Sequence, residues 1–259
     1  MFIPYGRQIV NDDDIDAVTQ VLKSDYLTQG PVVPKFEASV ASYTGSKFAV
    51  AVNSATSALH LACLALNVTS KDYVWTSPIT FVASANCALY CGASIDFVDI
   101  DPISYNMSVS ALKKKLEIAK KNKSLPKVVI PVHLAGQSCE MIEIHKLSKE
   151  YGFKIIEDAS HAIGAKYLDK PVGNCLYSDI TVFSFHPVKI VTSVEGGMAV
   201  TNSPEYSNIM QRLRSHGITR DPAEMKGSTE GSWFYQQLEL GFNYRMSDVH
   251  AALGLNQMK

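Results

Sequence analysis

The chain alternates short runs rich in β-branched and aromatic residues with longer amphipathic segments, and this rhythm narrows the folds open to it. The short runs predict strands at 48–52, 73–76, 94–98, 127–132, 153–157, 180–185 and 197–201. The longer segments predict helices at 11–23, 34–45, 55–66, 81–90, 110–121, 140–151, 205–215 and 247–258. Regular alternation of this kind is typical of an α/β fold, in which helices flank a mostly parallel sheet.

Two of the predicted strands, 128–130 and 153–156, are nearly continuous apolar runs, as expected of strands that are buried on both faces. Ligands of such sheets bind at the carboxyl ends of the strands, so polar residues that follow a strand are the first candidates for a site. The pattern leaves the order of the strands open. We expect an N-terminal arm and helix at 1–25 and one large domain at 26–259.

The charge balance argues against a nucleic-acid partner, because 24 Lys and Arg are offset by 25 Asp and Glu. The one basic cluster, 113–123, has Leu112, Leu116 and Ala119 at helical spacing opposite it, which predicts the solvated face of a helix. Five cysteines without a C-x-x-C pair predict neither a disulfide framework nor a zinc site. Since no signal peptide or membrane-length apolar run is recognised, we expect a cytoplasmic protein without a membrane partner.

Lys189 is the first candidate for chemistry, because it follows a predicted strand within five residues and precedes a Glu-Gly-Gly turn at 195–197. The nine residues from Ile180 to Val188 contain only one ionisable side chain, that of His186. Apolar surroundings lower the pKa of a lysine and make its amine nucleophilic, as a Schiff-base lysine requires. A loop lysine taken alone is most often a solvated charge, so the neighbourhood carries this prediction.

Asp158 lies at the carboxyl end of a predicted buried strand, where a carboxylate has no packing role. In a site for pyridoxal 5′-phosphate (PLP), an aspartate there would pair with the pyridine nitrogen and keep it protonated. Two other interpretations stay open. Asp158 could cap the segment that follows, or Asp158 and His161 with His133 or His186 could bind a metal, although no dense His/carboxylate motif supports the second.

The turn at 53–59, Asn-Ser-Ala-Thr-Ser-Ala-Leu, begins a predicted helix and is rich in small hydroxyl residues. Free N–H groups at a helix start, together with Ser and Thr hydroxyls, can bind phosphate. A well-capped helix without a ligand is the simpler interpretation. Phe81, which follows Pro78 at the next helix start, could stack on a planar cofactor or pack in the core. The absence of a glycine-rich dinucleotide fingerprint and of a P-loop disfavours a nicotinamide or ATP enzyme.

In combination and order, these segments resemble the fold-type-I PLP-dependent sugar-nucleotide aminotransferases of the DegT/DnrJ/StrS family. The resemblance runs from Pro4 to Lys259. It is carried by the segments 27–31 (LTQGP), 53–59, 80–86 (TFVASAN), 131–136 (PVHLAG), 157–164 (EDASHAIG), 184–197 and 241–248 (GFNYRMSD). It implies the large domain of that fold.

By this resemblance, Lys189 holds the cofactor covalently and shuttles the proton, Asp158 binds its pyridinium nitrogen, and His161 lies beside its ring. The resemblance also implies that Ala55, Thr56 and Ser184 bind the phosphate and that Phe81 stacks on the ring. Asn243 is expected to reach the phosphate in the partner subunit. The residues expected to line the sugar pocket are Tyr5, Tyr26, Leu27, Thr28 and Gln29. Sites shared between subunits imply an obligate homodimer.

Within the family, the segments 3–8 and 214–221 look like the aminotransferases of pseudaminic-acid biosynthesis. That likeness implies transfer of an amino group from glutamate to C4 of UDP-2-acetamido-2,6-dideoxy-β-L-arabino-hex-4-ulose. Lys189 disfavours dehydration, because related sugar dehydratases carry histidine at this position. The alternatives are another nucleotide-linked 4-keto sugar, a catalytically inactive homologue that binds PLP or a sugar, and a nucleotide-sugar oxidoreductase.

Two departures from the family pattern bear on these expectations. Ile190 stands where close relatives carry proline, a change that the loop should tolerate. Relatives continue into a smaller C-terminal domain that covers the active site, and we expect this domain to be missing from the chain. A native chain that stopped at Lys259 would expose surface that the domain normally buries, with impaired folding or activity.

Overall fold

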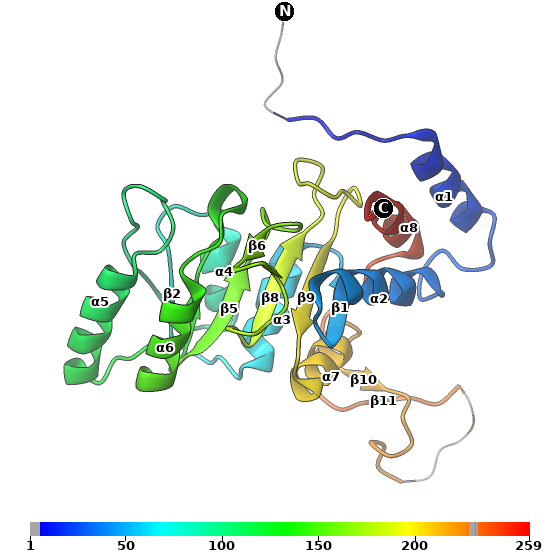
Figure 1. Cartoon of the computed structure of the whole chain (residues 1–259). Helices are drawn as coiled ribbons and strands as arrows, with labels where there is room; N and C mark the ends of the chain where they lie inside the picture. Colours follow the sequence, from blue (N-terminus) through cyan, green and yellow to red (C-terminus); the bar gives the residue numbers. More distant parts are fainter. Residues whose placement is uncertain (1–5, 228–230, 232) are drawn as a thin grey trace, which may run out of the picture.

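A computed structural model describes residues 6–227, 231 and 233–259, which form a seven-stranded sheet covered by helices (Figure 1). The strand order is β1 (Phe48–Val52), β9 (Gly197–Thr201), β8 (Ile180–Ser184), β5 (Lys154–Asp158), β4 (Val128–Ile130), β2 (Tyr73–Thr76) and β3 (Ser94–Phe97). The pairs from β3 to β8 are parallel, whereas β9 runs antiparallel to both β1 and β8. The prediction of a mostly parallel α/β sheet is confirmed.

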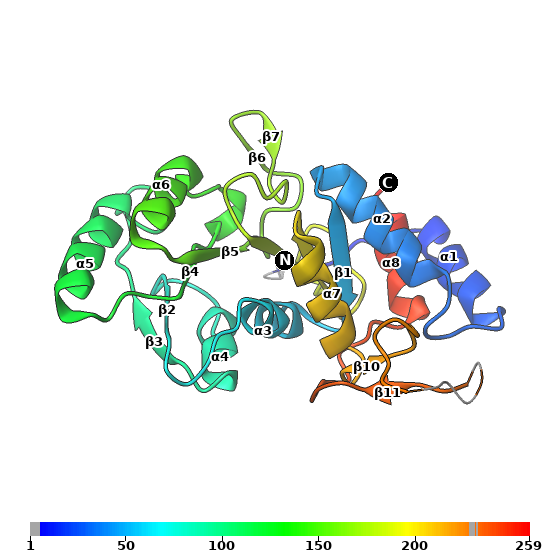
Figure 2. The same ribbon diagram turned by 90° about the horizontal axis from the view of Figure 1, so that it is seen from below.

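Each face of the sheet has its own apolar core and its own helices (Figure 2). One face is covered by α3 (Ala55–Ala65), α4 (Ala83–Tyr90) and α7 (Pro204–Leu213). The other face is covered by α5 (Val109–Asn122) and α6 (Met141–Tyr151) at one end, and by α2 (Val32–Thr44) and α8 (Asp248–Gln257) at the other. Strands buried on both faces explain the continuous apolar runs in the sequence.

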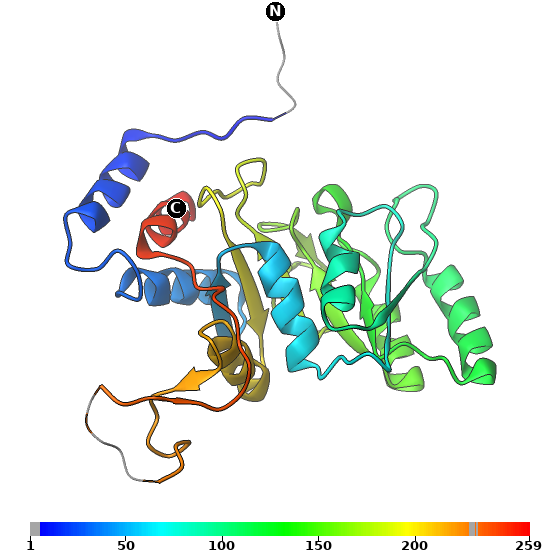
Figure 3. The same cartoon turned by 180° about the vertical axis from the view of Figure 1, so that it is seen from behind.

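The first and last helices pack together at one edge of the molecule, where α1 (Asp12–Leu22) lies against α8 (Figure 3). Asn11 caps α1, since its side chain accepts from the N–H of Asp14 and the side chain of Asp14 accepts from the N–H of Asn11. Asp14 also reaches across to α8. Its buried carboxylate accepts from Asn256 at 2.8 Å and from Gln257 at 2.7 Å.

Several boundaries differ from the sequence-based expectations for local reasons. Helix α2 begins at Val32 rather than after Pro34, because a proline is tolerated in the first turn of a helix. Helix α4 begins at Ala83, so Phe81 precedes it and is 71% exposed, which excludes the core-packing interpretation. The pattern also missed the short hairpins β6–β7 (Lys166–Tyr167, Lys170–Pro171) and β10–β11 (Ile218–Thr219, Gln236–Gln237), whose two-residue strands are too short to show a period.

The lysine-rich segment is the solvated face of α5, as predicted. Leu112 and Leu116 are fully buried, while Lys113 and Lys114 are exposed. All five cysteines are free thiols, and four of them are buried.

Replacing Asp14 by alanine is expected to lower the free energy of unfolding by about 1–3 kcal/mol, because donors of α8 and of Asn11 then lose their acceptor. Urea unfolding followed by circular dichroism measures the change. Asp16→Ala removes an exposed carboxylate from the same helix and is the matched control, with an expected change within about 0.5 kcal/mol. Equal losses in the two variants would contradict the role assigned to Asp14.

Candidate active site

The carboxyl ends of β5 and β8 open into a cavity of about 680 Å³. Of the eight residues predicted to bind the cofactor, seven line this cavity: Ala55, Thr56, Phe81, Asp158, His161, Ser184 and Lys189. They come from four separate segments of the sequence, and the sheet brings them together because parallel strands end at the same edge.

One end of the cavity is the N-terminus of α3. Ser54 caps the helix by accepting from the N–H of Ser57 at 3.1 Å, while the N–H groups of Ala55 and Thr56 find no acceptor within the described residues. Gly197 of β9 lies so close that a Cβ there would be 2.4 Å from the nitrogen of Ala55. Free N–H groups at the positive end of a helix dipole, enclosed by close backbone packing, fit a phosphate group.

Asp158 forms part of the cavity floor and is 4% exposed. Its Oδ2 accepts from the hydroxyl of Ser84 at 2.6 Å, and its Oδ1 accepts from the N–H and hydroxyl of Ser160 at 3.1 and 2.7 Å. The capping interpretation is therefore correct in part, since Asp158 does hold the turn at Ser160. Oδ2 accepts only one of these bonds and keeps a further lone pair, so the group can also accept a bond from a ligand.

The metal interpretation does not fit the geometry. His133 is fully buried, with Nε2 2.6 Å from Glu157 and Nδ1 accepting from the N–H of Cys139, so it has no free nitrogen. Across residues 6–227, 231 and 233–259, no group of three or more His, Cys, Asp or Glu side chains is arranged to hold a metal ion.

Lys189 lies in the connection from β8 to β9, in a turn where its N–H donates to the carbonyl of His186 at 2.8 Å. Burial lowers the pKa of Lys189 below its ordinary value, and the charge of Asp158 opposes this shift in part. Its amine makes no hydrogen bond or ion pair with the part of the chain that the structure describes. The site thus holds a partly desolvated amine without a partner, which favours nucleophilic chemistry.

The predicted sugar-binding residues do not line this cavity. Tyr26, Leu27, Thr28 and Gln29 form an exposed loop that is joined to the start of α8, and Gln29 borders a separate hollow. Asn243 is also exposed and outside the cavity, and Tyr5 lies outside the described residues. Their roles stay predictions.

The sequence missed Ser84, whose hydroxyl contacts Asp158 although the two residues are 74 positions apart. It lies inside a segment that carries the family resemblance, but nothing local distinguishes it from a core serine. Ser160 follows Asp158 by two residues and could have been found as a turn partner of an aspartate.

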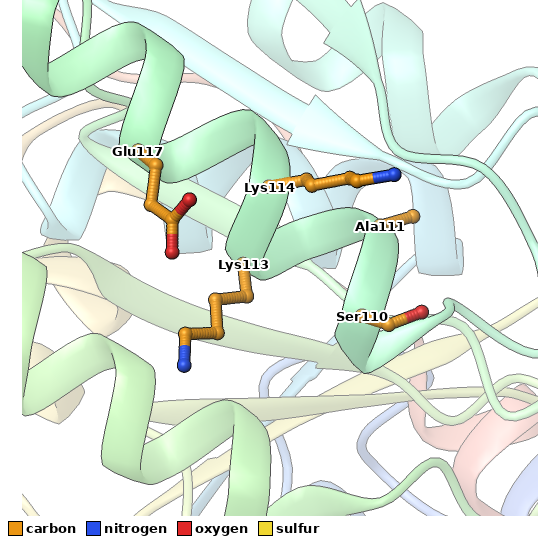
Figure 4. Close-up of a pocket in the computed structure, with 5 residues that line it drawn as sticks. All are labelled: Ser110, Ala111, Lys113, Lys114 and Glu117. Atoms are coloured by element: carbon orange, nitrogen blue, oxygen red, sulfur yellow. The ribbon is translucent and has the colours of Figure 1, made fainter.

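A second hollow lies over α5 and is lined by Ser110, Ala111, Lys113, Lys114 and Glu117 (Figure 4). The side chains of Lys113 and Lys114 extend in different directions and do not converge on a common point (Figure 4). We assign no function to this hollow. Within the described part of the chain, no helix has the length and apolar character needed to cross a bilayer.

Residues 8–259 match the DegT/DnrJ/EryC1/StrS aminotransferase family. The chain is 42% identical over 257 residues to a UDP-4-amino-4,6-dideoxy-N-acetyl-β-L-altrosamine transaminase of Campylobacter jejuni, covering 99% of this chain and 64% of that protein. It superposes on Helicobacter pylori PseC, an aminotransferase involved in pseudaminic-acid biosynthesis, with a TM-score of 0.87 and 33% identity, covering 99% and 65% of the two chains. It also superposes on a putative sugar aminotransferase of Streptococcus pneumoniae in its pyridoxamine phosphate (PMP) form, with a TM-score of 0.87 and 31% identity. That match covers 99% of this chain and 67% of the other.

The chain therefore belongs to the DegT/DnrJ/EryC1/StrS aminotransferase family, whose cofactor is PLP. It spans 64% of the length of the curated relatives that it matches. The cavity fits this cofactor chemically, since it places phosphate-binding N–H groups, a fixed carboxylate and a free amine around one space.

Replacing Asp158 by asparagine is expected to lower the pKa of Lys189 further, because the variant removes the negative charge that favours the ammonium form. Only the unprotonated amine is acylated, so the rise in the acylation rate of Lys189 should move to lower pH. Peptide mapping after acetic anhydride treatment of the cofactor-free protein at a series of pH values measures it. Asp169→Asn, an exposed substitution, is the control. An unchanged or upward-shifted acylation profile in Asp158→Asn would contradict the effect assigned to the charge of Asp158.

Proposed function

We propose that this chain is the cofactor-binding part of a PLP-dependent aminotransferase that acts on a nucleotide-linked keto sugar. The observation that carries the proposal is the arrangement of Lys189 and Asp158 around one cavity that ends at the N-terminus of α3. Membership of an aminotransferase family supports the reaction class.

Each residue of the site would have a role that follows from its position in the cavity. Bound PLP supplies an electron sink for breaking a bond to hydrogen at the reacting carbon. Lys189 would hold the cofactor and would move the proton, for which its lowered pKa is suited. Asp158 would orient the ring nitrogen, and the orientation of its own carboxylate is fixed by Ser84 and Ser160. The N–H groups of Ala55 and Thr56 and the hydroxyl of Ser184 would hold the phosphate.

On the open side, Phe81 is 71% exposed at the cavity wall, where a ring would be covered by stacking on it. Val188 and Ile190, on either side of Lys189, are 51% and 66% exposed. This degree of apolar exposure around a site supports a further covering surface, and we propose that a partner copy of the chain provides it. Asn243 and the Tyr26–Gln29 loop would then act in the site of the partner, together with Tyr5.

For the substrates, we propose glutamate as the amino donor and UDP-2-acetamido-2,6-dideoxy-β-L-arabino-hex-4-ulose, aminated at C4, as the acceptor. The support is the likeness to the altrosamine transaminase of Campylobacter jejuni and to PseC. Another nucleotide-linked 4-keto sugar is the competing acceptor. Amino transfer by the full-length protein is measured with each of these two acceptors. The preferred acceptor should show the higher kcat/KM.

Replacing Lys189 by alanine is expected to abolish covalent attachment of PLP and to reduce amino transfer by at least about 10²- to 10⁴-fold, since the covalent anchor and the proton-transfer group are lost together. Borohydride reduction followed by peptide mass spectrometry locates the attached cofactor. The exposed Lys170→Ala is the control and should retain attachment. Attachment of PLP at another lysine in the unaltered protein would overturn the proposal. Attachment at Lys189 without any amino transfer would identify an inactive homologue.

A further inference from the structure

His161 is held at the cavity wall by a hydrogen bond from the main chain. The N–H of Ala135 donates to Nδ1 of His161 at 3.2 Å. A nitrogen that accepts a hydrogen bond carries a lone pair, so in the neutral ring the proton resides on Nε2. Nε2 has no hydrogen-bond partner within the described residues, although the side chain borders the cavity.

The loop that supplies this N–H has an unusual backbone conformation. Ala135, in the 3₁₀ turn η1 (Leu134–Gly136), lies in the left-handed region with φ 53° and ψ 23°. Gly136 follows at φ 89°, and a Cβ there would be 3.0 Å from the carbonyl oxygen of His161. A non-glycine residue keeps a left-handed conformation only where its surroundings hold it.

Asn106 helps to keep η1 in this conformation. Its side chain is 4% exposed and contacts both ends of η1, since Oδ1 accepts from the N–H of Leu134 at 3.1 Å and Nδ2 donates to the carbonyl of Gln137 at 3.0 Å. The residue before the turn is fixed as well, because the N–H of His133 donates to the carbonyl of Asp158 at 3.0 Å. The position of the Ala135 N–H is thus set from both sides.

We propose that Asn106 is a positioning residue, which acts through η1 to hold His161 as the Nε2–H tautomer and so reserves this N–H as a donor to an oxygen acceptor of the ligand in the cavity. The tautomer follows from the chain alone. Only the assignment of the ligand as PLP rests on the proposed function.

The charges around His161 agree with a neutral ring. Burial lowers the pKa of His161, the charge of Lys189 lowers it further, and Asp158 opposes both. With a pKa below its ordinary value, the ring is mostly uncharged at neutral pH. Uncharged, it can serve as a donor without adding a second cation next to Lys189.

Nitrogen NMR of cofactor-free protein containing ¹⁵N-histidine at neutral pH tests the proposal. The signal of His161, identified by its loss in His161→Gln, should show an unprotonated Nδ1 and a protonated Nε2. In Asn106→Ala, the two nitrogen shifts should move towards each other and the pKa of His161 should rise, because the N–H of Ala135 no longer stays against Nδ1. Gln137→Ala removes an exposed side chain from the same loop and should leave the signal unchanged.

An Nδ1–H tautomer or an evenly averaged mixture in the unaltered protein would overturn the proposal, and this measurement decides even if Asn106→Ala fails to fold. A His161 signal in Asn106→Ala identical to that of the unaltered protein would contradict the positioning role of Asn106. Adding PLP should move the Nε2 resonance. Binding of PLP, seen in its visible absorbance, without such a change would overturn the donor role. Failure of PLP to bind would count against the proposed function while leaving the tautomer measurement intact.

Discussion

Two successive carboxylates at the end of β5, Glu157 and Asp158, impose the strongest requirement on the rest of the structure. Side chains alternate across a strand, so the two groups face opposite sides of the sheet. Both are almost fully buried, at 5% and 4% exposure, and a buried charge is tolerated only where donors compensate it. Glu157 is compensated by His133, Ser178 and Thr181, whereas Asp158 receives three hydrogen bonds from Ser84 and Ser160.

This requirement links the site to the fold on both faces. The donors to Glu157 are His133, which follows β4 and directly precedes η1, Ser178, which precedes β8, and Thr181, which lies in β8. Ser84, which donates to Asp158 from a distant part of the sequence, lies on α4, and α4 covers the other face of the sheet. The carboxylate of Asp158 is therefore fixed in orientation, while the amine of Lys189 in the same cavity has no hydrogen-bond partner among the residues that the structure describes. A fixed acceptor and a free amine together suit a site that holds a ligand between them.

The sequence allowed the long elements and seven residues of the cavity to be predicted, for different reasons. The strands followed from apolar runs, and the helices followed from the longer amphipathic segments. The seven cavity residues followed from their place after strands and from the family resemblance. The roles of Tyr26–Gln29 and Asn243 could not be located in the same way, because these residues lie outside the cavity of their own chain.

What the sequence determined by itself is therefore local: the period of each element, the caps, and the polar residue types at the ends of strands. These depend on neighbours within a few positions, which a single sequence displays. The tertiary structure decided the strand order, the antiparallel direction of β9, the contact between Ser84 and Asp158, and the clamp of Asn106 on η1. Each of these joins residues that are far apart in the chain, and their pairing depends on how the two faces of the sheet fill with side chains, which no local pattern encodes.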